Sequence, residues 1–242
     1  LAEMFADLDR HFNVRARPHH AQAFARACAA GQAANLGLGR AFGEQMQALP
    51  YARESVLAAG ARLGEHVVVD VSRGPIVVAE GAEVGPFALL TGPALLGPRA
   101  RVNAHAAIRE FVALGHTTKI GGEIEASIIE PYTNKQHYGF LGHSYLGSWV
   151  NLGAGTCNSD LKNTYGLVNM EYQGHKVATG MQFVGAIVGD YAKTAINTGI
   201  FTGKTIGVCS MVYGFVTTNV PSFVNYARLF GQAQRLIATT SK

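Results

Sequence analysis

Aliphatic residues recur at every sixth position along much of this sequence, and no other feature limits the possible folds as strongly. The recurring residues are Val78, Val84, Leu90, Leu96, Val102, Ile108, Leu114 and Ile120. The position four residues after each of them is small in most units, as at Ala82, Ala88, Ala94, Ala100 and Ala106. A short period that holds over so many units is typical of a solenoid.

A six-residue period predicts a coil with three flat faces. Each face is expected to be a very short strand with its aliphatic side chain pointing inward, and stacked coils then pair as parallel strands. The period returns in two later runs, at Leu146 and Leu152, and again at Val188, Thr194, Ile200, Ile206 and Val212. We therefore predict an all-β parallel β-helix, with irregular insertions at about 127–139 and 158–181.

The segments on either side of the repeat differ from it. Residues 1–62 are rich in Ala, and the stretch "HAQAFARACAAGQAANL" has the apolar spacing of a helix, which predicts an N-terminal helical segment. The β-helix domain is expected over residues 63–220. A helical tail is expected over residues 221–242.

Composition narrows the choice of ligand and compartment. Charged residues form 15% of the 242 residues, and the net charge of +4 comes from scattered Lys and Arg, which favours a small anionic ligand over nucleic acid. The cysteines, Cys28, Cys157 and Cys209, form no CxxC pair, so neither a disulfide framework nor a structural zinc site is expected, and a reducing cytoplasm fits best. No apolar run reaches the roughly 18 residues that a membrane span requires, so no membrane association is expected.

Two stretches carry a family resemblance. The sequences "HYGFLG", which starts at His137, and "WVNLGAGTCNSD", which starts at Trp149, resemble the motif of hexapeptide-repeat acyltransferases with a left-handed β-helix. The resemblance is strongest to the acetyltransferase half of the bifunctional GlmU enzyme and to GlmU-like sugar-nucleotidyltransferase proteins, and it covers residues 67–220. It implies a homotrimer that transfers an acetyl group from acetyl-CoA, without a metal, to an amino-sugar phosphate such as glucosamine-1-phosphate, or to a nucleotide-linked amino sugar.

The resemblance also implies roles for single residues. His137 stands where the family has its general base, and an imidazole suits this role because it titrates near the working pH. Arg109 stands where the family has an arginine that binds the sugar phosphate, and a guanidinium binds phosphate well through two hydrogen bonds. The other substrate-binding candidates are Lys135, Phe140, Asn151, Asn158 and Lys162, and the acyl-CoA-binding candidates are Asp190 and Val208.

Three departures from the family motif keep a second hypothesis open. Phe140 replaces a Tyr beside the base, Ser159 replaces another Tyr, and Asp190 replaces a Ser whose N–H faces the thioester carbonyl. These changes favour a non-catalytic module that trimerises or regulates a sugar-1-phosphate nucleotidyltransferase, whose Gly-rich loop is not found in these residues.

A zinc-dependent hydration enzyme is a third hypothesis, because three histidines at a subunit interface can bind zinc. The spacing of His105, His116, His137, His143 and His175 argues against it.

Overall fold

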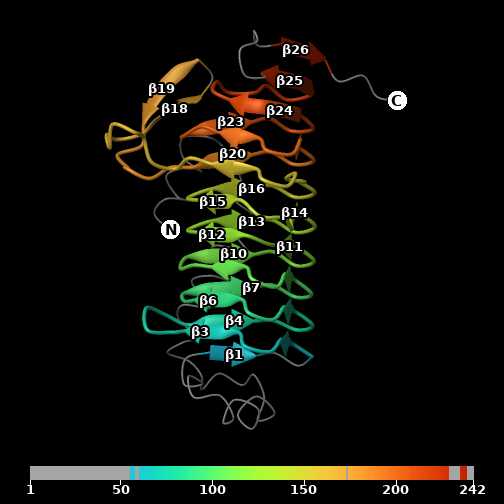
Figure 1. Ribbon diagram of the computed structural model, residues 1–242. Coiled ribbons are helices and arrows are strands. Elements are labelled where there is room, and N and C mark those ends of the chain that lie inside the picture. The colour runs from blue at the N-terminus through green and yellow to red at the C-terminus, as the bar shows by residue number, and fades with distance from the viewer. Residues whose placement is uncertain (1–54, 58–59, 173, 229–234, 239–242) are drawn as a thin grey trace. The chain divides into compact units, whose positions relative to one another are not determined.

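The computed structural model describes residues 55–57, 60–172, 174–228 and 235–238 (Figure 1). The chain divides into two compact units, residues 1–126 and 127–242. In each unit, short strands form coils that stack on one another, and their pairing between coils is mostly parallel. The described residues form strands and turns without any helix, so the predicted all-β, left-handed parallel β-helix is confirmed.

The first unit has three parallel ladders, one for each face of its coils. The first ladder contains β1 (Ser55–Leu57), β4 (Ile76–Val78), β7 (Ala94–Leu96) and β10 (Val112–Leu114). The second contains β2 (Arg62–Leu63), β5 (Glu83–Val84), β8 (Arg101–Val102) and β11 (Lys119–Ile120), and the third contains β3 (Val68–Asp70), β6 (Leu89–Thr91), β9 (Ala107–Ile108) and β12 (Glu123–Glu125). Partners such as Leu96 and Leu114 are three hexads apart, which is one full turn.

The core of this unit follows the predicted period. The aliphatic position of each hexad is buried, with Leu90, Leu96 and Ile108 fully inaccessible, and the small position is buried as well. The corners are less dependent on glycine than the sequence suggests, because Phe87 and Arg99 occupy left-handed backbone conformations there. Gly85 is needed for a different reason, since a Cβ atom on it would lie 2.5 Å from the backbone nitrogen of Ala104 in the next coil.

The second unit is built in the same way, from short strands in stacked coils. Its ladders contain β13 (Ile128–Ile129), β14 (Asn134–Lys135), β15 (Phe140–Gly142), β16 (Tyr145–Leu146), β17 (Cys157–Asn158), β20 (Ala186–Val188), β21 (Lys193–Thr194), β22 (Gly199–Ile200), β23 (Lys204–Ile206) and β24 (Met211–Val216). The irregular insertion expected at 127–139 is not formed, because β13 pairs in parallel with β16 and Asn134 bridges to Asn151. The sequence pattern is hidden there because Lys135 takes the place of the aliphatic residue.

The second expected insertion is present and forms an arm between β17 and β20 (Figure 1). It contains an antiparallel hairpin of β18 (Asn169–Tyr172) and β19 (His175–Ala178). Val168 and Met170 are buried at the hairpin, whereas Tyr165 and Leu167 are exposed. The arm is therefore attached to the unit by apolar packing on one side.

The two ends of the chain differ from the predictions. Most of the expected helical segment, residues 1–54 and 58–59, lies outside the described residues, and Ser55–Leu57 within that range forms strand β1. The expected C-terminal helix is wrong, since β25 (Val224–Arg228) pairs with β24 and β26 (Arg235–Ala238) pairs with β25. The physical reason is that the last coil has unpaired backbone N–H and C=O groups along its strand edge, and β25 and β26 form hydrogen bonds there. The buried Tyr226, whose hydroxyl donates to the carbonyl of Phe215, secures β25.

Candidate active site

The coil that precedes β15 has a lysine inside it. Lys135 is in register with the buried Leu152 and is only 2% exposed, and its Nζ donates a hydrogen bond of 2.7 Å to the carbonyl oxygen of His137. Burial away from water lowers the pKa of the Lys135 ammonium to about 8, against a smaller opposing effect of Cys157. The ammonium thus ties the main chain at His137 to the core, while the His137 side chain is exposed. This placement does not suit the direct substrate contact expected of Lys135.

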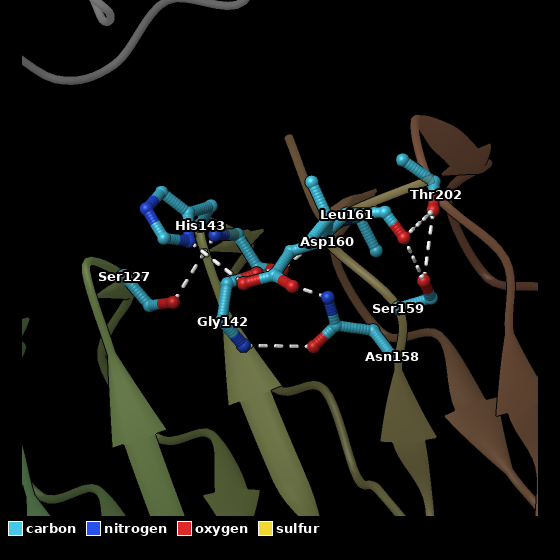
Figure 2. A network of polar contacts seen from close by, with 10 residues as sticks. Ser127, Gly142, His143, Asn158, Ser159, Asp160, Leu161 and Thr202 are labelled. Atoms are coloured by element: carbon cyan, nitrogen blue, oxygen red, sulfur yellow. Dashed lines mark hydrogen bonds and ion pairs between the residues drawn. The ribbon is translucent and has the colours of Figure 1, made fainter. Parts of the chain in front are cut away.

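Asn158 joins β17 to β15 through its side chain. Its Oδ1 accepts from the Gly142 N–H at 2.8 Å, and its Nδ2 donates to the Gly142 carbonyl at 2.9 Å (Figure 2). The side chain is buried, and its amide imitates the backbone pairing of a neighbouring strand. Asn158 therefore has a structural role here, and its amide is not free to bind a sugar as the resemblance implies.

His143 follows β15 and contacts both ends of the arm. Its Nδ1 lies 2.8 Å from Oδ2 of Asp160, at the start of the arm, and its ring stacks on Phe183, at the end of the arm, with centroids 5.2 Å apart. The side chains of His143 and Asp160 are 23% and 14% exposed. Figure 2 shows that one ring nitrogen of His143 faces Asp160, whereas the other points away from the network.

Phe140 lies close to this pair. A Cβ atom on Gly142 would collide both with Asp160 Oδ2 and with the ring carbon Cζ of Phe140, each at 2.4 Å, so both groups crowd Gly142. Only glycine leaves room for both of them. The candidate Phe140 is thus brought together with His143 and Asp160, two residues to which the sequence analysis gave no role in acyl transfer.

Asn151 and Lys162 have different surroundings. Asn151 is half-buried, and its side-chain amide makes no hydrogen bond to the described part of the chain, so it is available to a ligand. Lys162 lies in the arm, where its Nζ donates to the carbonyl of Leu167 at 2.5 Å. That bond closes the loop before the hairpin.

Arg109 lies in the first unit, directly after β9. Its side chain is 42% exposed, and its guanidinium lies 3.7 Å from Glu123 and 4.0 Å from Glu110. The side chain is accessible to an anion, although the two carboxylates compete for its charge.

The two acyl-CoA candidates lie in the later coils of the second unit. Asp190 is exposed, and its Oδ1 accepts from the Ser148 N–H at 2.8 Å. Val208 is 37% exposed, but its N–H donates to the Ser222 hydroxyl at 3.0 Å and its carbonyl accepts from the Phe223 N–H at 2.9 Å. The backbone of Val208 is therefore already engaged, which leaves its side chain as the surface for an acyl donor.

The contact between His143, Asp160 and Phe183 was not predicted from the sequence. Asp160 ends the second quoted stretch and His143 directly follows the first, but their pairing could not be seen in the sequence. Phe183 lies beyond the arm, and only the fold brings it to His143.

The described residues contain neither a group of metal ligands nor a membrane-spanning helix. In the described ranges, no group of three or more His, Cys, Asp and Glu side chains is arranged to hold a metal ion. Over the same residues, no helix has the length and apolar character needed to cross a membrane.

Comparison with known proteins gives several relatives. No protein-family model matches the chain. The chain is 27% identical over 149 residues to the bifunctional sugar-1-phosphate nucleotidylyltransferase/acetyltransferase of Sulfurisphaera tokodaii, a match that covers 61% of this chain and 37% of that protein. It is 31% identical over 153 residues to the bifunctional protein GlmU of Methanococcus aeolicus, which covers 62% of this chain and 36% of that protein. The chain thus spans only about a third of the length of these relatives.

A solved structure supports the fold. The UDP-N-acetylglucosamine acyltransferase of Francisella novicida superposes with a TM-score of 0.51 at 15% identity, covering 76% of this chain and 68% of that one. At this identity the likeness concerns the fold alone. By its six-residue repeat, its stacked coils and its relatives, the chain resembles the hexapeptide-repeat acyltransferases with a left-handed β-helix.

Proposed function

We propose that this protein is an acyl-CoA-dependent N-acyltransferase that uses acetyl-CoA and acts on an amino-sugar phosphate, such as glucosamine-1-phosphate, or on a nucleotide-linked amino sugar. The observation that carries the proposal is the exposed imidazole of His137, on a main chain that the buried Lys135 ammonium holds in place. The names of the relatives, which include an acetyltransferase activity and sugar phosphates, support the same substrate class.

The chemistry requires one positioned base. The amine nitrogen of the acceptor attacks the thioester carbonyl carbon, and His137 takes the proton that the nitrogen loses. The carbon–sulfur bond then breaks, and the departing thiolate of coenzyme A takes this proton, which leaves the amide and a neutral imidazole. Binding and orientation of the two substrates supply the remaining acceleration.

Other residues are proposed to bind the acceptor. The free side-chain amide of Asn151 suits a sugar hydroxyl, and the accessible guanidinium of Arg109 suits the phosphate. The net charge of +4 favours binding of an anionic acceptor.

The test is a direct assay of the purified chain with acetyl-CoA and glucosamine-1-phosphate. Release of the coenzyme A thiol, followed with a thiol-reactive chromophore, and an acceptor heavier by one acetyl group are the expected results. If neither product forms with glucosamine-1-phosphate or with a nucleotide-linked amino sugar, the proposal is wrong.

Two observations favour a second candidate, a non-catalytic trimerising or regulatory module of a sugar-1-phosphate nucleotidyltransferase. Both backbone groups of Val208 already have partners, and the carboxylate of Asp190 would oppose a negative charge on the thioester oxygen. Equilibrium titration with coenzyme A separates the two candidates, because the module is expected not to bind it.

A further inference from the structure

Four side chains meet at the foot of the arm, beside strand β15. The imidazole of His143 stacks on Phe183, and its Nδ1 contacts Asp160, while the ring end of Phe140 and the Asp160 carboxylate both crowd Gly142. Phe183 is 41% exposed, and Phe140 and His143 are half-buried. The group therefore reaches the surface and presents two aromatic rings around one polar pair.

Asp160 determines which nitrogen of His143 is available. Since a carboxylate accepts a hydrogen bond, Nδ1 of the ring carries the hydrogen and donates it to Oδ2. In the neutral imidazole, Nε2 is then an acceptor with a free lone pair, and Figure 2 shows this side of the ring turned away from the network. The stacking on Phe183 holds the plane of the ring, so the acceptor has a fixed direction.

We propose that Phe140, His143, Asp160 and Phe183 form the subsite for the sugar ring of the acceptor, with Nε2 of His143 accepting a hydrogen bond from one ring hydroxyl. This inference rests on the proposed function and adds the part of the acceptor that is recognised. A pyranose has apolar C–H faces and polar hydroxyl edges, and a site with aromatic walls and one oriented acceptor matches both.

The charge at this site argues for a hydroxyl and against the phosphate. Oδ2 of Asp160 lies 2.8 Å from Nδ1 of His143. Among the described residues, no other charged side chain lies within ion-pair distance of His143. A phosphate placed at Nε2 would therefore lie near an uncompensated negative charge. The phosphate of the acceptor is expected to bind elsewhere.

The position of β15 relates this subsite to His137. The strand contains three residues, Phe140–Gly142, with His137 before it and His143 after it. An acceptor lying along β15 would present its amine toward His137 and its far hydroxyls toward His143.

The test combines His143→Phe with acceptors that lack single hydroxyls. His143→Phe keeps a ring against Phe183 but removes Nε2, and it is expected to raise the KM for glucosamine-1-phosphate about tenfold, with kcat and the KM for acetyl-CoA nearly unchanged. With the parent protein, one of the 3-, 4- and 6-deoxy analogues of glucosamine-1-phosphate is expected to show the same loss. With His143→Phe, that analogue is expected to lose nothing further, because the two changes remove the same hydrogen bond.

His175→Phe is the matched control, since His175 is exposed in β19 and lies outside the subsite. If His143→Phe does not fold, Phe183→Leu removes the aromatic wall and is expected to raise the acceptor KM in the same way.

The outcomes separate the two proposals. If the parent protein acetylates amino sugars but the folded variant has an unchanged KM for all acceptors, the subsite proposal is overturned and His143 only fastens the arm. If the parent protein acetylates none of them, the proposed function fails, and binding of glucosamine-1-phosphate by saturation-transfer NMR still decides the subsite. Signals from the sugar protons that disappear in His143→Phe would support it, and signals that persist would overturn it.

Discussion

At the scale of single residues, Lys135 is the least expected feature of this protein. It occupies a position that an aliphatic residue fills in other coils, and it is buried with its ammonium bonded to the carbonyl of His137. A charged group in an apolar interior destabilises the fold unless polar partners compensate for the lost water. Its presence here suggests that the main chain at His137 is held at some expense of stability.

The pKa of Lys135 predicts how stability depends on pH. The pKa falls from the usual 10.5 in the unfolded chain to about 8 in the folded protein, so between these values the unfolded chain binds more protons. The free energy of unfolding is therefore expected to rise from pH 8 to 10.5 by about 3 kcal/mol from this residue. Below pH 8 both states are protonated and this gain is absent.

Lys135→Met is expected to remove this rise, which urea titrations at pH 7 and pH 10 would measure. Lys176→Met, a change at an exposed lysine of β19, serves as the control and is expected to keep it. Equal pH dependence in the parent and in Lys135→Met would contradict the prediction.

His137→Ala is expected to lower kcat by about 10² to 10⁴, the usual contribution of a positioned general base. The urea midpoint is expected to stay close to that of the parent, because the ring is exposed. His175→Ala is a control with an equally exposed ring. An unchanged kcat in His137→Ala would show that the imidazole takes no part in the transfer.

At the scale of elements, side-chain contacts hold the arm and strand β17 in place at positions where regular backbone pairing between strands is missing. Asn158 connects β17 to β15 through the backbone of Gly142, and the contacts of His143 with Asp160 and Phe183 join the ends of the arm. The backbone adds to this join, since the Gly185 N–H donates to the carbonyl of His143 at 2.8 Å. The arm is thus fastened at its base by both side chains and main chain.

Asn158→Ala is expected to lower the free energy of unfolding by about 1 to 3 kcal/mol, because it leaves the buried N–H of Gly142 without its acceptor. Asn163→Ala, at an exposed position of the arm, is expected to change it by less than about 0.5 kcal/mol. Chemical denaturation of both variants would show the difference. Similar losses would mean that the amide of Asn158 does not connect the strands.

At the scale of the whole molecule, exposed aromatic side chains support the proposed homotrimer. In the second unit, Tyr132, Trp149 and Tyr191 stack in a row with centroids 4.6 and 6.1 Å apart, and their exposed fractions are 39%, 48% and 53%. A continuous apolar surface of this kind is typical of a protein interface.

Sedimentation equilibrium is expected to give three times the chain mass of 25.7 kDa. Trp149→Glu is expected to weaken the association, because it places a charge in the stacked row. A parent protein that remains monomeric at micromolar concentration would overturn the proposal.

The repeated coil can be predicted from the sequence alone. A six-residue period permits one arrangement of inward aliphatic side chains, so the buried positions from Val78 to Ile120 followed directly from it. The period did not predict the regular coil around Lys135, because a lysine stands there at the aliphatic position. It also did not predict strands β25 and β26, because their sequences contain no hexad repeat. By contrast, the meeting of Asp160 and Phe183 at His143, from either side of the arm, is visible only in the folded chain. Their contact depends on the path of the arm between β17 and β20. The six-residue period does not extend through this arm, so it cannot predict which side chains meet at its base.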